Sequence, residues 1–196
     1  MKRFIAFTLA ETLIVMGIIG IVSALTLPNL NASTGEKEKV AKVKKLYSNL
    51  NDAVGRAVAV YGPIDEWFST DTTYSAQNTR FAERITEFMK VSKNCVLTTN
   101  SGCFVDKIKP ITGTGDYSLS SNDYKFMTAD GSSIAIHLSY KRIFVDIDGP
   151  NKGTGAFGRD VFAFMVDYEN NSLRVENYIP SMSELLTTGT GIPPTQ

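Results

Sequence analysis

Residues 7–30 read FTLAETLIVMGIIGIVSALTLPNL, and this stretch decides the expected fold. From Thr12 to Leu30, no residue is charged over 19 positions. Because a helix rises about 1.5 Å per residue, such a run reaches roughly the 30 Å thickness of the hydrocarbon core of a bilayer. Lys2 and Arg3 precede the run and favour a cytoplasmic location for that end. The sequence therefore predicts an N-terminal helix embedded in a membrane.

A secretory signal peptide is the competing interpretation, because it also begins with basic residues followed by an apolar stretch. Two features count against it. The apolar run is longer than the roughly 7–15 residues usual in a signal peptide. Glu11 also lies between two apolar blocks, where a carboxylate is costly in lipid unless a partner neutralises it. We therefore expect Glu11 to have a partner in an assembly.

Residues 7–22, FTLAETLIVMGIIGIV, resemble the N-terminus of type IV pilins and type II secretion pseudopilins. In that family the mature chain begins with Phe-Thr-Leu, carries Glu at its fifth position and continues as an apolar helix. The resemblance implies that residues 1–6 form a leader, that cleavage falls between Ala6 and Phe7, and that Phe7 is N-methylated. The chain has Ala6 where the family usually has Gly, so a slightly larger side chain precedes the cut.

The resemblance also implies the function: a structural subunit, pilin or pseudopilin, of a type IV pilus-like or type II secretion filament. Glu11 of one subunit would pair with the amino group of Phe7 in its neighbour, because each charge alone is costly in lipid. Pro28 matches the position at which many members carry a helix-bending proline.

The implied partners are copies of the chain and other pilins, a prepilin peptidase, an inner-membrane assembly platform and membrane lipid. The implied location is the inner (cytoplasmic) membrane, crossed once, with the head outside the cytoplasm, followed by an extracellular or periplasmic filament after assembly. Two alternatives stay open: a membrane-anchored extracytoplasmic adhesin that never polymerises, and a DNA-uptake pilin. The second would bind DNA through the lysines of the helix, namely Lys37, Lys39, Lys42, Lys44 and Lys45.

Composition excludes several other classes. The 196 residues include 20 Lys+Arg and 20 Asp+Glu, so the net charge of zero supplies no general field for nucleic acid. With 43% hydrophobic residues the chain is not wholly disordered, and two Cys with one His argue against finger-type zinc sites. No Walker loop or nucleophile motif is present, so we expect no enzyme.

We predict an α+β, pilin-like fold: a long N-terminal helix, membrane-embedded in its first half (7–30), packed on a small antiparallel β-sheet. Apolar residues at steps of three and four predict an amphipathic second half over 31–61. Residues 62–180 would form the globular head and 181–196 a polar tail. The expected elements of the head are a helix over 78–91 and strands over 124–128, 133–140, 142–148, 161–168 and 173–178.

Cys95 and Cys103 bracket a short loop. If the chain is translocated, they lie in an oxidising compartment and can pair. A metal pair or a catalytic thiol lacks companions, because no CxxC occurs and His137 is distant in sequence. We therefore predict a structural disulfide between Cys95 and Cys103.

One loop, Asp146 to Gly153, clusters oxygen ligands around glycine, with Asp146, Asp148 and Asn151 as candidate calcium ligands. The favoured interpretation is a turn without a cofactor, because EF-hand spacing is absent. The segment from Gly153 to Gly158 spells GxGxxG, but no βαβ context supports a dinucleotide site. Alternation along its strand places His137 on the solvent side of the sheet.

Overall fold

The structure, a computed structural model, describes residues 8–97, 102–110 and 115–175, the side chains of residues 25–34 excepted. The chain divides into two units, Met1–Glu38 and Lys39–Gln196, which are described separately. The predicted leader, with Ala6 and Phe7, and the predicted tail over 181–196 lie outside the described residues, as does the side chain of Pro28.

Helix α1 (Leu9–Tyr61) supplies the described part of the first unit and continues into the second. The prediction that its first half is embedded in a membrane is wrong for the residues described: none of their helices combines the length and the apolar character needed for a span. The first described run of side chains on α1 covers only residues 9–24 and includes Glu11. A span needs about 20 consecutive, predominantly apolar residues.

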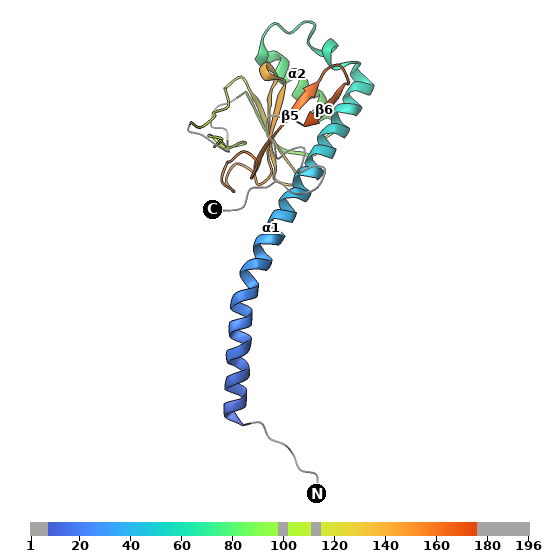
Figure 1. Ribbon diagram of the computed structural model, residues 1–196. Coiled ribbons are helices and arrows are strands. Elements are labelled where there is room, and N and C mark those ends of the chain that lie inside the picture. The colour runs from blue at the N-terminus through green and yellow to red at the C-terminus, as the bar shows by residue number, and fades with distance from the viewer. Residues whose placement is uncertain (1–7, 98–101, 111–114, 176–196) are drawn as a thin grey trace. The chain divides into compact units, whose positions relative to one another are not determined.

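The second unit is α+β with a six-stranded antiparallel sheet in its described part (Figure 1). From here on, the head means this whole unit, which includes the residues of α1 from Lys39 onward as well as the predicted head over 62–180. The strands lie side by side in chain order, so each pairs with the next along the sequence. The strands are β1 (Val91–Leu97), β2 (Tyr124–Thr128), β3 (Ser133–His137), β4 (Arg142–Asp146), β5 (Val161–Asp167) and β6 (Ser172–Val175). The helices besides α1 are η1 (Ile64–Phe68), α2 (Tyr74–Thr86) and the short η2 (Leu138–Tyr140).

The residues of α1 that belong to the head pack on the last two strands. Tyr47 donates a hydrogen bond to the carbonyl of Leu173 at 2.9 Å, and its ring lies 5.1 Å from that of Phe164. Asn51 accepts a hydrogen bond from the Leu173 N–H, also at 2.9 Å. Of the predicted apolar stripe, Val43, Leu50 and Val54 are fully buried, whereas Tyr47, Val58 and Tyr61 are half-buried. Leu46 and Ala57, which the stripe did not include, are at most 2% exposed. Burial of this stripe against the sheet is the main hydrophobic contribution of α1 to the head.

The opposite face of the sheet is covered as well, and this overturns the prediction for His137. A second apolar cluster lies there, formed by Phe104, Ile108, Ala135, Phe144, Val161 and Ala163. His137 is 8% exposed and therefore buried rather than at the surface. Alternation placed it on the correct face, but the sequence did not show that the segment around Phe104 covers that face.

Several element ends also differ from prediction. The strand expected over 133–140 ends at His137 because η2 follows, and the strand expected over 142–148 ends at Asp146. The second helix runs from Tyr74 to Thr86, where Thr73 accepts a hydrogen bond from the Ala76 N–H and caps it. Strand β1 was not predicted, because its sequence VSKNCVL does not alternate between apolar and polar residues, and it lies mostly exposed at the sheet edge.

Candidate assembly surface

Glu11 lies in the first turn of α1, and Thr8 directly precedes the helix. The side chain of each residue accepts a hydrogen bond from the backbone N–H of the other. The Glu11 N–H donates to Thr8 Oγ1 at 3.3 Å, and Glu11 Oε2 accepts from the Thr8 N–H at 2.9 Å and from its hydroxyl at 2.8 Å. This is a capping box, in which two side chains satisfy N–H groups that the first helical turn leaves unpaired. Sequence reasoning missed it, although the spacing Thr-x-x-Glu was visible. The carboxylate therefore has a local structural role besides any role in assembly.

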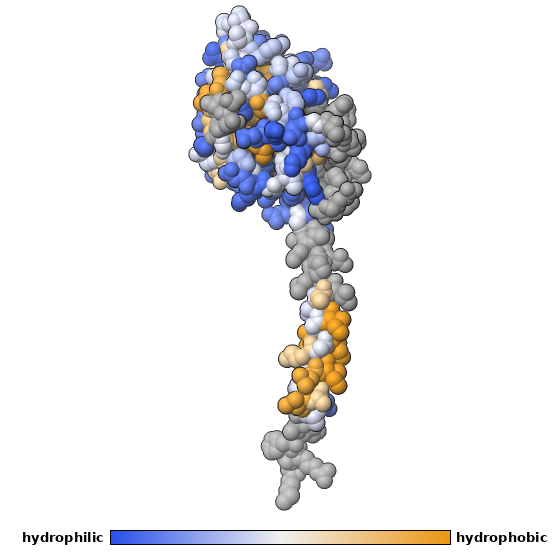
Figure 2. All heavy atoms as spheres, turned by 90° about the vertical axis from the view of Figure 1, so that its left-hand side faces the viewer, coloured by the Kyte–Doolittle hydropathy of each residue, from blue (hydrophilic) through white to orange (hydrophobic). Residues whose placement is uncertain are grey.

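Beyond the cap, α1 exposes large apolar side chains on all sides. Leu9 is 78% exposed, Met16 is 70% exposed and Ile18 is 57% exposed. Consecutive residues such as Ile14, Val15 and Met16 point in directions about 100° apart, so the exposed apolar surface is not confined to one face. Figure 2 shows this stretch coloured mostly as hydrophobic. We call this exposed apolar part of α1 the assembly surface, as a candidate for contact with other copies. It consists of Leu9, Leu13, Ile14, Val15, Met16, Ile18, Ile19, Ile21 and Val22.

Two glycines lie within the assembly surface. A Cβ added at Gly17 or Gly20 would meet no heavy atom within 4 Å. The two residues are three positions apart and so share one side of the helix. Without side chains, they leave room there for the backbone of a neighbouring helix to approach closely.

The predicted disulfide between Cys95 and Cys103 is confirmed, with the two Cα atoms 6.1 Å apart. Cys95 lies in the edge strand β1, and Cys103 is fully buried beside Phe104 in the chain. The bridge therefore ties the sheet edge to the segment that covers the second face of the sheet.

The loop that carries the candidate calcium ligands uses its acidic residues within the fold. Asp146 is fully buried, and its Oδ1 accepts N–H groups of Asp148 and Gly149, both at 3.1 Å. Its Oδ2 is buried and has no hydrogen-bond partner among the described residues. Burial is the largest cause that raises the pKa of Asp146 to about 7, and the carboxylates of Asp160 and Asp148 act in the same direction. The two N–H donors oppose this shift.

Asp148 instead pairs with α1, because its carboxylate lies 3.5 Å from the amines of both Lys39 and Lys42. Asn151 is exposed in the following turn. Among the described residues, no group of three or more His, Cys, Asp or Glu side chains is placed to hold a metal ion. The favoured turn without a cofactor and the calcium alternative both stay predictions.

The GxGxxG segment holds a carboxylate of the same chain. Asp160 is fully buried and accepts the N–H groups of Thr154, Gly155 and Ala156 as well as the Thr154 hydroxyl. Gly153 has φ +75°, and a Cβ there would lie only 2.2 Å from Asp160 Oδ2. Backbone N–H groups arranged in this way form an anion cradle. Here Asp160 occupies the cradle, which explains the glycines without a dinucleotide.

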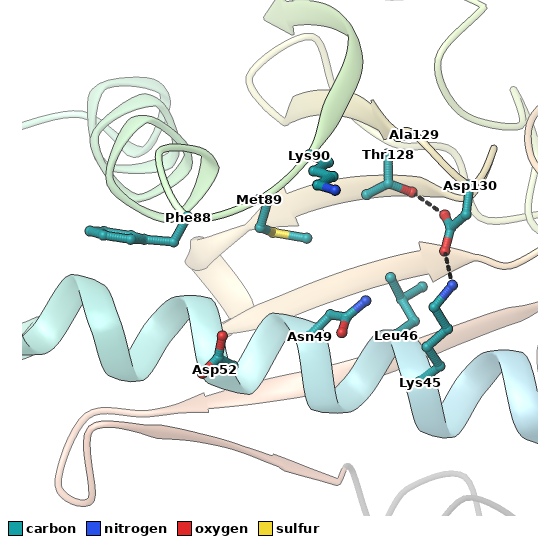
Figure 3. A pocket seen from close by; sticks show the side chains of 10 residues that line it. All are labelled: Lys45, Leu46, Asn49, Asp52, Phe88, Met89, Lys90, Thr128, Ala129 and Asp130. Atoms are coloured by element: carbon teal, nitrogen blue, oxygen red, sulfur yellow. Dashed lines mark hydrogen bonds and ion pairs between the residues drawn. The ribbon is translucent and has the colours of Figure 1, made fainter.

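A pocket of about 520 Å³ lies within the head, between α1, the segment after α2 and the turn after β2 (Figure 3). Lys45 lies 3.4 Å from Asp130, which also accepts the Thr128 hydroxyl at 2.6 Å. These contacts tie the β2–β3 turn to α1. The pocket is lined by Lys45, Leu46, Asn49, Asp52, Phe88, Met89, Lys90, Thr128, Ala129 and Asp130.

Comparison of the chain with models of protein families, with curated proteins and with solved structures finds no match in any of the three.

Proposed function

We propose that this chain is a structural subunit, pilin or pseudopilin, of a type IV pilus-like or type II secretion filament. In this proposal the assembly surface on α1 bundles with the same surface on other copies. The observation that carries the proposal is the exposure of nine large apolar side chains around the first described turns of α1. Exposed apolar surface of this kind marks an interaction site, because its burial is favourable at about 25 cal/mol per Å².

A second copy of the chain is the occupant that best fits this surface. An apolar exterior on all sides suits the interior of a helical bundle, where each helix is surrounded by others. Gly17 and Gly20 would let one neighbour approach closely. Glu11 is the single charged residue from Thr8 to Ala24, so it would be buried in such a bundle and would need a cation. The amino group that cleavage before Phe7 would create has the required charge.

The disulfide supports a head outside the cytoplasm, because such bonds persist in oxidising compartments. Location at the inner membrane before assembly stays a prediction. The DNA-uptake alternative gains no support from the lysines of the head. Lys39 and Lys42 face Asp148, and Lys45 faces Asp130, so part of their charge is already neutralised.

The decisive experiment separates the two roles of Glu11. Glu11→Gln removes the charge and retains a residue that serves in a capping box, whereas Glu11→Leu removes both. We expect both variants to be expressed and processed normally but to yield at least about tenfold less sheared filament, measured by electron microscopy with an immunoblot of the remaining monomer. Thr8→Val is the matched control, since it weakens the cap and keeps the charge.

The results distinguish the explanations clearly. Normal filament yield from Glu11→Gln together with loss in Glu11→Leu would assign Glu11 to the cap alone. Normal yield from both would remove Glu11 from assembly.

Processing is tested separately: the N-terminus of the mature protein should be N-methylated Phe7, and an N-terminus beyond Ser23 would instead indicate removal of an ordinary signal peptide.

A further inference from the structure

Three polar side chains form a hydrogen-bonded chain at the end of β3 in the head. Asp123 Oδ1 lies 2.5 Å from His137 Nδ1, and His137 Nε2 lies 2.8 Å from Ser139 Oγ. His137 is the last residue of β3, Ser139 lies in η2, and Asp123 lies in the turn before β2. No sequence motif joins the three residues, so their proximity cannot be predicted from the sequence.

The order of donors and acceptors follows from the chemistry of the three groups. A carboxylate only accepts, so Asp123 requires that His137 carries a proton on Nδ1. In the neutral imidazole, Nε2 is then the acceptor, and the Ser139 hydroxyl donates its proton to it. In this order of donors and acceptors, a His that is oriented by an Asp can take the proton of a serine hydroxyl and so activate the serine as a nucleophile.

Burial and neighbours suit that role. The side chains of Asp123 and His137 are 2% and 10% exposed, so their contact is shielded from water. The second carboxylate oxygen of Asp123 accepts the Ser120 N–H at 2.6 Å, which fixes the orientation of the acid. The Tyr140 ring stacks on the His137 ring with 5.1 Å between centroids and 4° between planes. Ser139 itself is exposed, so a small molecule can reach the hydroxyl.

We propose that Ser139, His137 and Asp123 form a nucleophilic site that hydrolyses small carboxylic esters accessible from solvent. Ser139 is the nucleophile, His137 is the general base and acid, and Asp123 is the positioning residue. This activity is additional to the proposed filament function, because all three residues lie in the head and none belongs to the assembly surface.

The reaction needs only the ester and water. Ser139 Oγ bonds to the carbonyl carbon while its proton moves to His137 Nε2, and the alcohol leaves with that proton as the ester bond breaks. A water molecule then gives a proton to Nε2, and its oxygen bonds to the acyl carbon. The bond from Ser139 to the acyl group breaks, Oγ recovers the proton from Nε2, and the carboxylic acid departs.

The test uses a fluorophosphonate probe, which is attacked by an activated serine with loss of fluoride, and p-nitrophenyl acetate as the ester. We expect intact-mass spectrometry of the full chain to show one probe per protein, mapped to Ser139 by peptide analysis. Ser139→Ala should lose this label, and His137→Gln should react at least about 100-fold more slowly. Ser121→Ala, at another exposed serine of the head, is the matched control and should react like the native protein.

A structural role for the same hydrogen bonds predicts a different outcome. If the hydrogen bonds only held the fold together, folded His137→Gln would be labelled as fast as the native protein, because no proton transfer from Ser139 would depend on the imidazole. Folding of each variant is checked by thermal melting, and because Ser139 is exposed, its replacement should leave melting unchanged. No label on the native protein, or equal labelling of Ser139→Ala, would overturn the proposal.

Discussion

Helix α1 carries large apolar residues both before Glu38 and after it, but the two parts use them differently. After Glu38, Val43, Leu50 and Val54 recur at helical spacing and are fully buried in the head. Before Glu38, Leu13 and Ile18 are 64% and 57% exposed. The first pattern fits one covering sheet, whereas the second is apolar on all sides and fits a bundle of helices. The comparison teaches that apolar residues of α1 stabilise the fold only where their spacing places them on the one side of the helix that packs against the sheet.

The largest expected effect comes from placing the same substitution in both parts of α1. Leu50→Asp puts an unpaired charge in the core, which costs more than the roughly 5–15 kcal/mol that stabilises an ordinary domain, so the head should not fold. Ile18→Asp should leave the melting of the head unchanged and should suppress filament formation. Circular dichroism and filament yield measure the two outcomes, and a folded Leu50→Asp head would contradict the comparison.

The next effect concerns pH and is confined to the head. Because the pKa of Asp146 is raised from 3.8 to about 7, its contribution to stability is complete below about pH 4 and is lost as pH rises through 7. The loss is on the order of 4 kcal/mol. Asp146→Asn should remove this dependence, since the amide stays neutral. The difference in unfolding free energy between the variant and the native protein, measured from pH 4 to pH 8, should grow with pH.

A flat difference would mean that Asp146 is already ionised at low pH or has a partner in solution. Asp167→Asn is a suitable control, because hydrogen bonds with Asn170 lower the pKa of Asp167 at the end of β5. Its contribution is present above the unfolded pKa and is lost as pH falls, which is the opposite direction.

Removal of the disulfide should have a smaller effect, again on the head alone. Closing a loop of this length stabilises a protein by roughly 2–3 kcal/mol. The Cys95→Ser, Cys103→Ser double variant should therefore melt several degrees lower while the proposed cleavage before Phe7 is unchanged. Mass spectrometry of the native protein without reductant should show the linked peptides, and two freely alkylated thiols would contradict the bridge.

The smallest effect compares the two helix N-caps. Thr73→Ala removes the acceptor of the Ala76 N–H at the start of α2 and should destabilise the head by about 1 kcal/mol. Thr8→Ala removes a cap of the same kind from α1 but should leave the denaturant midpoint of the head unchanged. A shift of the head midpoint by Thr8→Ala would show that the two units unfold together.

The strands with strong local signals were predictable. The pattern around the Asp130-Gly131 turn places β2 against β3, and the structure pairs Phe126 with Ile134. The edge strand β1 was not predictable, because its pairing with β2 rather than an alternating sequence makes it a strand. The capping box was visible in sequence as Thr8 and Glu11 but was overlooked.

The sequence by itself determined the features that depend on neighbours along the chain: the buried stripe of α1, the turn-bounded strands and the pairing of Cys95 with Cys103 across a short loop. Only the tertiary structure decided the features that depend on distant segments. The ring of Tyr117 lies 6.3 Å from that of His137 and comes from a segment outside the strands, and the contact of His137 with Asp123 joins residues 14 positions apart. Periodicity reports which side of an element a residue occupies, whereas burial depends on what long-range packing places against that side.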